Sequence, residues 1–151
     1  MKKYSSTKKI TLGSCAFRQP FAESHCKYLH GYLLTAKFWF ECEELDENNW
    51  VVDFGGLKEF KTFLTKTFDH KTIISANDPH KSTFIELDDL GVLDLIVFRR
   101  GVGIERFAEY CFKKADEHVK ILTKERCWVT KCEIWEHETN SAIYKNETKH
   151  K

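Results

Sequence analysis

No apolar stretch of this chain is long enough to cross a bilayer, and no basic amphipathic segment argues for binding at a membrane surface. Residues 1–6 begin with two lysines, as a secretory signal does, but no apolar segment follows them. We therefore expect a cytoplasmic protein with no membrane partner.

An excess of charge of one sign is also missing. The chain has 24 Lys and Arg against 23 Asp and Glu, a formal net charge of +1, and the two signs are interspersed. A protein that neutralises many phosphates needs a concentrated basic surface. We therefore expect no nucleic-acid partner.

The six cysteines include no C-x-x-C pair, and without an export signal they are better interpreted as reduced thiols than as a disulfide framework. Cys26 differs from the rest because it lies between His25 and Lys27 in a turn-like segment, and a neighbouring cation raises the reactivity of a thiol. Four others are expected to be small buried hydrophobes: Cys15, Cys42 and Cys132 in strand-like segments and Cys111 in a helical one.

Bulky apolar residues, by contrast, are plentiful. Twelve Phe and four Trp supply core material, so residues 1–151 are expected to form one folded domain, in which no internal repeat is visible. Both alternating faces of residues 29–43 carry large side chains, so we expect this strand to be covered on both sides, one of them by another subunit. Strands are expected over residues 10–17, with a bulge at Gly13, and over residues 29–43, 50–54, 92–98, 127–136 and 142–144.

Helical periodicity marks two segments, residues 57–68 and 104–122, with Asp53 as a candidate cap before the first. The order of the main elements is β-β-α-β-α-β. This order predicts an α+β fold in which two helices cover one face of a mostly antiparallel sheet. In the last long strand, one face is expected to carry Trp128, Thr130, Cys132, Ile134 and Glu136.

Several acid–base groups recur in a suggestive order. A thiol at Cys26 stands four residues before His30, an Asp69-His70 pair follows the first helix, and Glu136 closes the last long strand. Such a set can move protons on a small heterocyclic substrate.

Together with Cys-x-x-Leu-His-Gly, Trp-Val-Val-Asp-Phe at residues 50–54 and Phe-Asp-His at residues 68–70, this order resembles the 6-pyruvoyltetrahydropterin and 6-carboxytetrahydropterin synthases. The likeness extends from about residue 17 to residue 144. It implies the tunnelling fold, a four-stranded antiparallel sheet with two helices on one side. It further implies an oligomeric barrel, commonly a hexamer, with active sites between subunits, 7,8-dihydroneopterin triphosphate as substrate and one zinc ion per subunit.

The resemblance also assigns roles to residues. Cys26 matches the family's catalytic cysteine, and Asp69 and His70 match an Asp-His pair in which the carboxylate orients the imidazole. On their own, Cys26 could be an inert thiol and the Asp-His pair a helix cap. Glu136 matches the residue that binds the edge of the pterin ring, with Glu138 as a rival.

A further substrate-contacting glutamate of the family corresponds to Glu105, at the start of the second helix. An acidic residue in a first helical turn is equally expected from its interaction with the helix dipole. The sequence leaves both interpretations of Glu105 open.

The metal site departs from the family pattern. His30 matches the first histidine of His-Gly-His, but Tyr32 replaces the second. Aligning the remaining ligand from Phe17 places Phe21 there, whereas aligning from Phe21 retains His25 and deletes the loop before Cys26. Zinc needs three or four ligands. His25 and His30 would supply two, and the third could be Cys26, Tyr32 or Glu23.

Three hypotheses follow. The first is a lyase on 7,8-dihydroneopterin triphosphate whose 6-carboxy product leads to deazaguanines such as queuosine, or to pterins. The second is a family member with changed, metal-free chemistry or another ring as substrate. The third is a non-catalytic module that binds pterin or purine rings.

Overall fold

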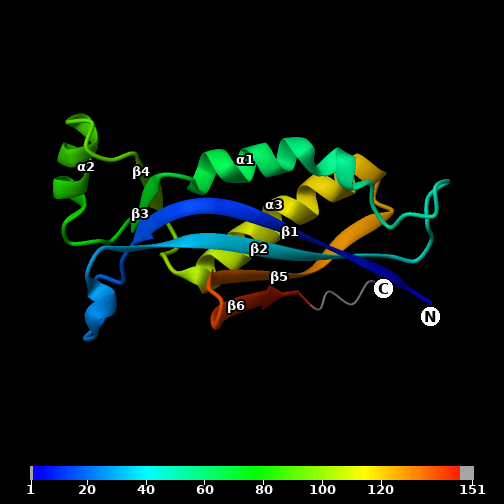
Figure 1. The fold of residues 1–151 in the computed structure, drawn as a ribbon, viewed down its shortest axis with the longest axis horizontal. Helices are drawn as coiled ribbons and strands as arrows, with labels where there is room; N and C mark the ends of the chain where they lie inside the picture. Colours follow the sequence, from blue (N-terminus) through cyan, green and yellow to red (C-terminus); the bar gives the residue numbers. More distant parts are fainter. Residues whose placement is uncertain (1, 147–151) are drawn as a thin grey trace.

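The computed structural model describes residues 2–146 and contains six strands and three α-helices (Figure 1). The chain order is β1 (Tyr4–Phe17), β2 (His30–Cys42), α1 (Lys58–Phe68), β3 (Lys71–Ser75), α2 (Lys81–Asp89), β4 (Leu95–Phe98), α3 (Ile104–Thr123), β5 (Cys127–His137) and β6 (Asn140–Lys145). Short 3₁₀ helices, η1 (His25–Lys27) and η2 (Phe54–Leu57), lie in two of the connections. No helix in the described part is long and apolar enough to span a membrane.

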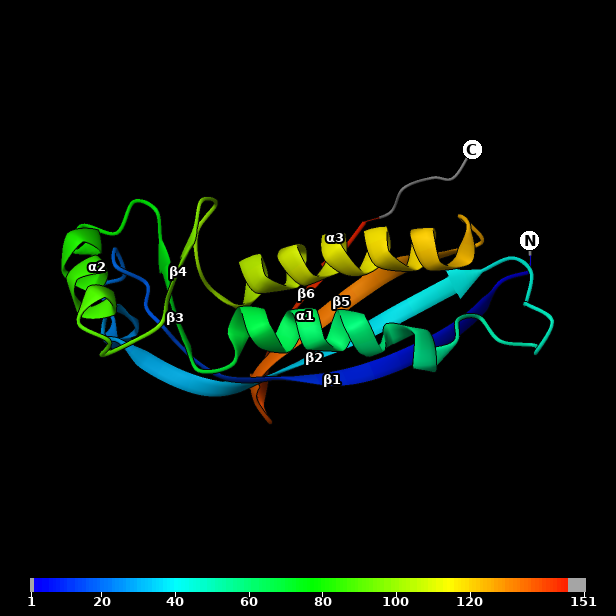
Figure 2. The same cartoon turned by 90° about the horizontal axis from the view of Figure 1, so that it is seen from above.

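The strands form one curled, mixed sheet in the order β4-β3-β1-β2-β5-β6. β1, β2, β5 and β6 pair antiparallel, as expected, whereas β3 and β4 are parallel additions next to β1. α1 and α3 run side by side over one face of the antiparallel part, and α2 lies beyond its end next to β4 (Figures 1 and 2). The predicted α+β class and the two covering helices are confirmed, and the four-stranded, purely antiparallel sheet is wrong.

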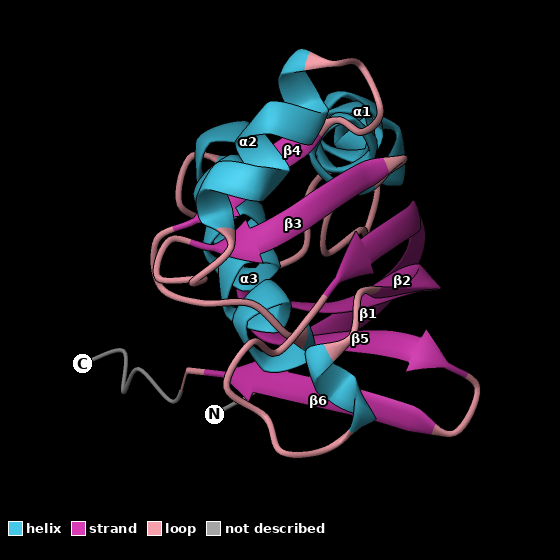
Figure 3. Cartoon of the chain, turned by 90° about the vertical axis from the view of Figure 1, so that its left-hand side faces the viewer, coloured by secondary structure: helices cyan, strands magenta, loops and turns pink. Residues whose placement is uncertain are grey.

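The missing elements have a physical reason. Four of the five residues of β3, from Thr72 to Ser75, are buried, so the strand shows no alternation of apolar and polar residues. Only Phe84 is buried in α2, which lies against the edge of the sheet rather than on its face (Figure 3). Neither segment therefore carries the periodicity that marks the longer elements.

Two local expectations are also corrected. Residues 50–54 form an irregular segment that leads into η2, rather than a strand, and Asp53 caps it by accepting a hydrogen bond from the N–H of Gly55 (2.8 Å). In β5 the register shifts opposite Trp39 and Phe40, so Cys127 and Val129 are buried before the bulge and Cys132 and Ile134 after it. The predicted single face from Trp128 to Glu136 is therefore broken at Thr130.

The core lies between the sheet and the two long helices. On β2 the alternation is as predicted, since Leu34, Ala36, Phe38, Phe40 and Cys42 are fully buried beneath the helices. Leu33, on the opposite face of the strand, is 61% exposed in the single chain. The helical repeat that marks residues 104–122 is borne out in α3, where Phe107, Ala108, Cys111, Phe112 and Ala115 are buried. The predicted second cover on β2, by another subunit, stays a prediction.

Gly13 is the bulge that the sequence predicts in β1, where the register with β2 shifts between Thr11 and Gly13. Its φ of +113° is a conformation that residues with a side chain rarely adopt. A β-carbon here would lie 2.2 Å from Oδ1 of Asp69. Glycine is needed at this position for both reasons, and the close approach places Asp69 against the backbone of β1.

Candidate active site

The loop between β1 and β2 carries Cys26 at one end of the sheet (Figure 1). Ser24 begins η1 by accepting a hydrogen bond from the N–H of Cys26 (3.3 Å). The carbonyl of Cys26 accepts from the N–H of Gln19 (2.8 Å), so the loop is closed across its base. The Cys26 thiol is thereby held in a short, internally hydrogen-bonded turn and remains partly accessible.

An ion pair anchors this loop to the protein. The guanidinium of Arg18 donates to both carboxylate oxygens of the buried Asp78 (2.9 and 3.2 Å) and to the carbonyl of Lys27 (3.0 Å). A forked contact of this kind restrains the geometry more than a single bond does. The sequence analysis did not single out Arg18 or Asp78, because their pairing links two loops that are far apart in the chain.

Aromatic rings line the sheet next to this loop. The ring of His30 contacts Phe17 (centroids 5.4 Å) and Tyr32 (5.3 Å), and Tyr32 also contacts His137 from β5 (5.9 Å). Nδ1 of His30 lies 2.6 Å from the carbonyl of Tyr28. A carbonyl can only accept, so Nδ1 carries the proton and Nε2 is left as an acceptor or metal ligand.

Tyr32 is linked to Glu136 through His137, whose ring contacts Tyr32 and whose Nε2 lies 3.9 Å from Oε1 of Glu136. Partial burial raises its pKa above the ordinary value, and the charges of Glu136 and Cys26 raise it further. The phenol therefore stays protonated at neutral pH and acts as a hydrogen-bond donor. Glu136 also accepts a hydrogen bond from the side chain of Asn140 (3.2 Å). The rival Glu138 lies in the exposed turn after β5, and the choice of Glu136 over Glu138 as the pterin-binding carboxylate stays a prediction.

Glu105 and Gln19 both lie beside Gly103, at the start of α3. Oε2 of Glu105 and the amide of Gln19 both lie next to Gly103, where a β-carbon would stand 3.5 and 2.6 Å from them. That amide also donates to the carbonyl of Val102 (2.6 Å). The start of α3 is therefore tied to the loop that carries Cys26. Gln19 is a positioning residue that the sequence analysis missed, because glutamine in an irregular segment gives no signal of its own.

Asp69 and His70 form the predicted pair on the far side of β1 from Tyr32, and His70 and Tyr32 line the same hollow. Oδ1 of Asp69 lies 3.0 Å from Nδ1 of His70 and accepts from the N–H of Ser14 (3.0 Å). The hydrogen bond from His70 is the main cause of a lowered pKa at Asp69. The His70 side chain is 85% exposed, and within residues 2–146 no hydrogen bond, ion pair or ring contact joins the pair to Cys26.

The backbone explains this separation. Cys15 pairs with Tyr32 on one side and with Lys71 on the other, so Tyr32 and the start of β3 are two strands apart, about 10 Å between backbones. His70 has a φ of +59°, which turns the chain sharply just before β3. The pair therefore lies beyond β1, on the side away from β2, where the His70 side chain is exposed.

The residues do not fit a zinc site of the expected kind. Among residues 2–146 no group of three or more His, Cys, Asp or Glu side chains is arranged to hold a metal ion. His25 is exposed in η1, and the neighbour of His30 on its own face is the protonated phenol of Tyr32. A neutral phenol is a poor ligand at neutral pH. The described part of the single chain thus offers no ready three-ligand site. Whether zinc binds through His30 and His25 is untested and stays a prediction.

In class, this is an α+β protein with two helices over the antiparallel part of a curled, mixed sheet and a cluster of phenol, imidazole and carboxylate groups at one end of that sheet, next to the loop that carries Cys26. The sequence profile of the 6-pyruvoyl tetrahydropterin synthase family matches residues 7–147, and the chain belongs to that family.

Individual relatives agree with this assignment. A 6-carboxy-5,6,7,8-tetrahydropterin synthase of Aquifex aeolicus is 29% identical over 129 residues, which cover 81% of this chain and 76% of that protein. The crystal structure of an uncharacterized protein from Wolinella succinogenes covers 97% of this chain and 100% of its own, with a TM-score of 0.85 and 20% identity. A catalytic-residue mutant of Plasmodium vivax 6-pyruvoyltetrahydropterin synthase covers 97% and 99%, with a TM-score of 0.72 and 17% identity. At these identities the two structures support the fold alone.

Proposed function

We propose that this chain is a lyase of the 6-carboxytetrahydropterin synthase type that acts on 7,8-dihydroneopterin triphosphate. Family membership and the Aquifex aeolicus relative support the reaction class. The observation that carries the proposal is the cluster at the start of β2, where the ring of Tyr32 contacts His30 (5.3 Å) and His137 (5.9 Å), and Nε2 of His137 lies 3.9 Å from Glu136. The product would enter deazaguanine biosynthesis of the queuosine type, or pterin biosynthesis, in the cytoplasm.

In this proposal each group has one task. The Glu136 carboxylate accepts hydrogen bonds from a ring N–H and the exocyclic amine of the pterin, a charge-assisted contact that fixes the ring. Glu105 supplies a second anionic contact from the start of α3. The Cys26 thiolate takes a proton from the substrate side chain and later returns one, while the Tyr32 phenol donates a hydrogen bond to a substrate oxygen.

We further propose that the second acid–base group comes from another copy of the chain. Within residues 2–146, β1 pairs only with β2 along Tyr4–Gly13, and β6 pairs only with β5, so both edges of the antiparallel part are open. β1, β2, β5 and β6 alternate in direction, so β6 of one copy can continue antiparallel onto β1 of the next. Unpaired edges of this length favour such pairing, and repeating it closes a barrel, which we propose is a hexamer.

This pairing would bring the separated groups together. The end of β1, the start of β2 and the turn between β5 and β6 all lie at the same end of the sheet. His70 stands next to β1 at Ser14 and is exposed there. A neighbour's β5–β6 hairpin laid along β1 would therefore carry Glu136 toward this outward-facing Asp69–His70 pair.

The mixing of two inactive variants tests the composite site. Cys26→Ala and His70→Ala proteins are each expected to be inactive as pure oligomers. Co-expressed in equal amounts, they should regain about a quarter of the parent activity, because random assembly gives that fraction of sites both intact groups. If each catalytic site were formed within one chain, the co-expressed mixture would regain no activity. The assay is turnover of 7,8-dihydroneopterin triphosphate, with the parent protein as reference.

A second candidate function rests on Tyr32. A protonated phenol where the family resemblance expects a metal ligand favours metal-free chemistry, or binding of a pterin or purine ring without turnover. Zinc per subunit in the purified protein, measured together with turnover, separates the candidates. Turnover with no bound zinc supports changed chemistry, and tight ring binding without turnover supports a binding module.

A further inference from the structure

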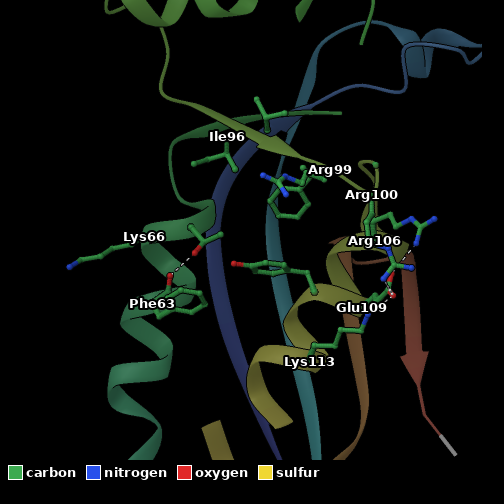
Figure 4. Close-up of a pocket in the computed structure, with 13 residues that line it drawn as sticks. Phe63, Lys66, Ile96, Arg99, Arg100, Arg106, Glu109 and Lys113 are labelled. Carbon is green, nitrogen blue, oxygen red and sulfur yellow. Dashed lines mark hydrogen bonds and ion pairs between the residues drawn. The ribbon is translucent and has the colours of Figure 1, made fainter. Parts of the chain in front are cut away.

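A cavity of about 600 Å³ opens between α1, β4 and the first half of α3 (Figure 4). It shares no lining residue with the Cys26 cluster. The two are separated by a layer of buried rings, in which Phe107 contacts Phe17 on the side of the cluster and Phe98 on the side of the cavity. The cavity is therefore a second site and not an extension of the first.

Aromatic side chains form much of the wall. Phe98 and Tyr110 stand 5.1 Å apart between ring centroids, and Tyr110 on α3 also packs against Phe68 of α1 (6.1 Å). Phe63 faces them from α1, and its ring is 40% exposed although the helical pattern predicts it as inward. Ile96 closes the wall from β4. A flat apolar or aromatic body would bury these rings.

One rim of the cavity is strongly basic. The carboxylate of Glu109 receives three cations: Lys113 (2.9 Å) and Arg100 (2.7 Å) on one oxygen and Arg106 (3.0 Å) on the other (Figure 4). These contacts lower the pKa of Glu109, Lys113 contributing most. Arg99, which precedes them in the chain, has no hydrogen-bond or ion-pair partner among residues 2–146. Arg99 and the three cations that contact Glu109 carry four positive charges against one negative charge. This rim therefore has a formal charge of +3.

We propose that this cavity binds a nucleotide-type ligand, a planar aromatic ring that carries phosphate. Its volume lies in the range typical of small-molecule sites, about 300–1,000 Å³. The aromatic walls fit the ring, and guanidinium groups are the side chains best suited to grip phosphate oxygens. Arg99 is free to take the first phosphate, and the Glu109 cluster, with its surplus of positive charge, takes the next. The inference does not depend on the proposed lyase activity.

Calorimetric titration of the full chain with ATP tests both halves of the proposal. Adenosine lacks the phosphates and inorganic triphosphate lacks the ring, so each should bind at least tenfold more weakly than ATP. The affinity for ATP should also fall as salt rises, because the rim contact is between charges. No binding of ATP at millimolar concentration would overturn the proposal, and equally tight binding of inorganic triphosphate would reduce the cavity to a simple anion site and overturn it as well.

Variants place the ligand. Arg99→Gln should weaken ATP binding at least fivefold, whereas Lys61→Gln, the same loss of charge on an exposed face of α1, should leave it within twofold of the parent. Phe63→Leu should weaken it at least threefold by removing one ring. Glu136→Gln should leave it unchanged, and a large effect there would put ATP in the Cys26 cluster and refute the assignment. If Arg99→Gln changed the oligomeric state measured by sedimentation, a second copy of the chain would be the occupant of the cavity. That result would also refute the assignment.

Discussion

Gly13 offers the sharpest test of how the Asp69–His70 pair is held. In Gly13→Ala the new methyl group would stand 2.2 Å from Oδ1 and 2.4 Å from the β-carbon of Asp69, on a backbone with a φ of +113°. The unfavourable backbone and the overlap with Asp69 together should lower the free energy of unfolding by about 2–5 kcal/mol.

Gly91→Ala is the matched control. Gly91 also has a positive φ, +73°, but a β-carbon there would meet nothing within 4 Å. Its cost should be that of the left-handed backbone alone, about 1–2 kcal/mol. Urea denaturation at one fixed protein concentration measures both variants under the same degree of association.

A double-mutant cycle isolates the contact. Asp69→Gly removes the three atoms nearest to the new methyl group, so adding it to Gly13→Ala should recover about 1–3 kcal/mol relative to the sum of the two single changes. Equal costs for Gly13→Ala and Gly91→Ala, together with additivity in the cycle, would refute the conclusion that Gly13 and Asp69 hold each other in place.

Three further predictions concern chemistry. Cys26→Ala should abolish turnover and leave pterin affinity nearly intact, since it removes a group needed in the transition state; an active variant in a turnover assay would remove Cys26 from the mechanism. Glu136→Gln should weaken pterin binding more than tenfold, at ~1.5–3 kcal/mol per charge-assisted hydrogen bond, and a calorimetric comparison with Glu138→Gln decides between the two carboxylates. Tyr32→His should raise zinc occupancy after dialysis against a mild chelator, and His30→Ala should lower it, because residue 32 lies on the same face of β2 as His30; a full zinc equivalent that survives His30→Ala would place the metal elsewhere.

Much of the fold could be predicted because its main elements carry a clear period. The alternation in β2 and the helical repeat in α1 and α3 reflect elements with one buried and one exposed face. β3 has no exposed face to contrast with a buried one. The bulge in β5 adds one residue to the strand, so the residues after it point to the opposite face from the one that simple alternation predicts. Neither leaves a mark that periodicity can detect.

Some residues of the candidate site could likewise be predicted from the sequence, and others could not. The resemblance supplied Cys26 and Glu136, and the fold places Glu136 beside His137, whose ring contacts Tyr32. That Asp69 and His70 lie two strands away depends on the parallel pairing of β3 with β1, which no spacing in the sequence reveals. Gln19 stayed invisible because its side-chain hydrogen bond to the carbonyl of Val102 exists only once two loops meet.

The distribution of thiols makes this chain its own folding reporter. Five of the six cysteines are buried and free, and burial raises the pKa of each, to about 12 for Cys15 and Cys127. Only Cys26 is partly accessible. Because thiolates and not thiols react with alkylating reagents, the folded chain should take up one label quickly at residue 26, and the other five only as the core opens. A label count over time would therefore follow the candidate catalytic loop and the core separately, with no cysteine introduced or removed.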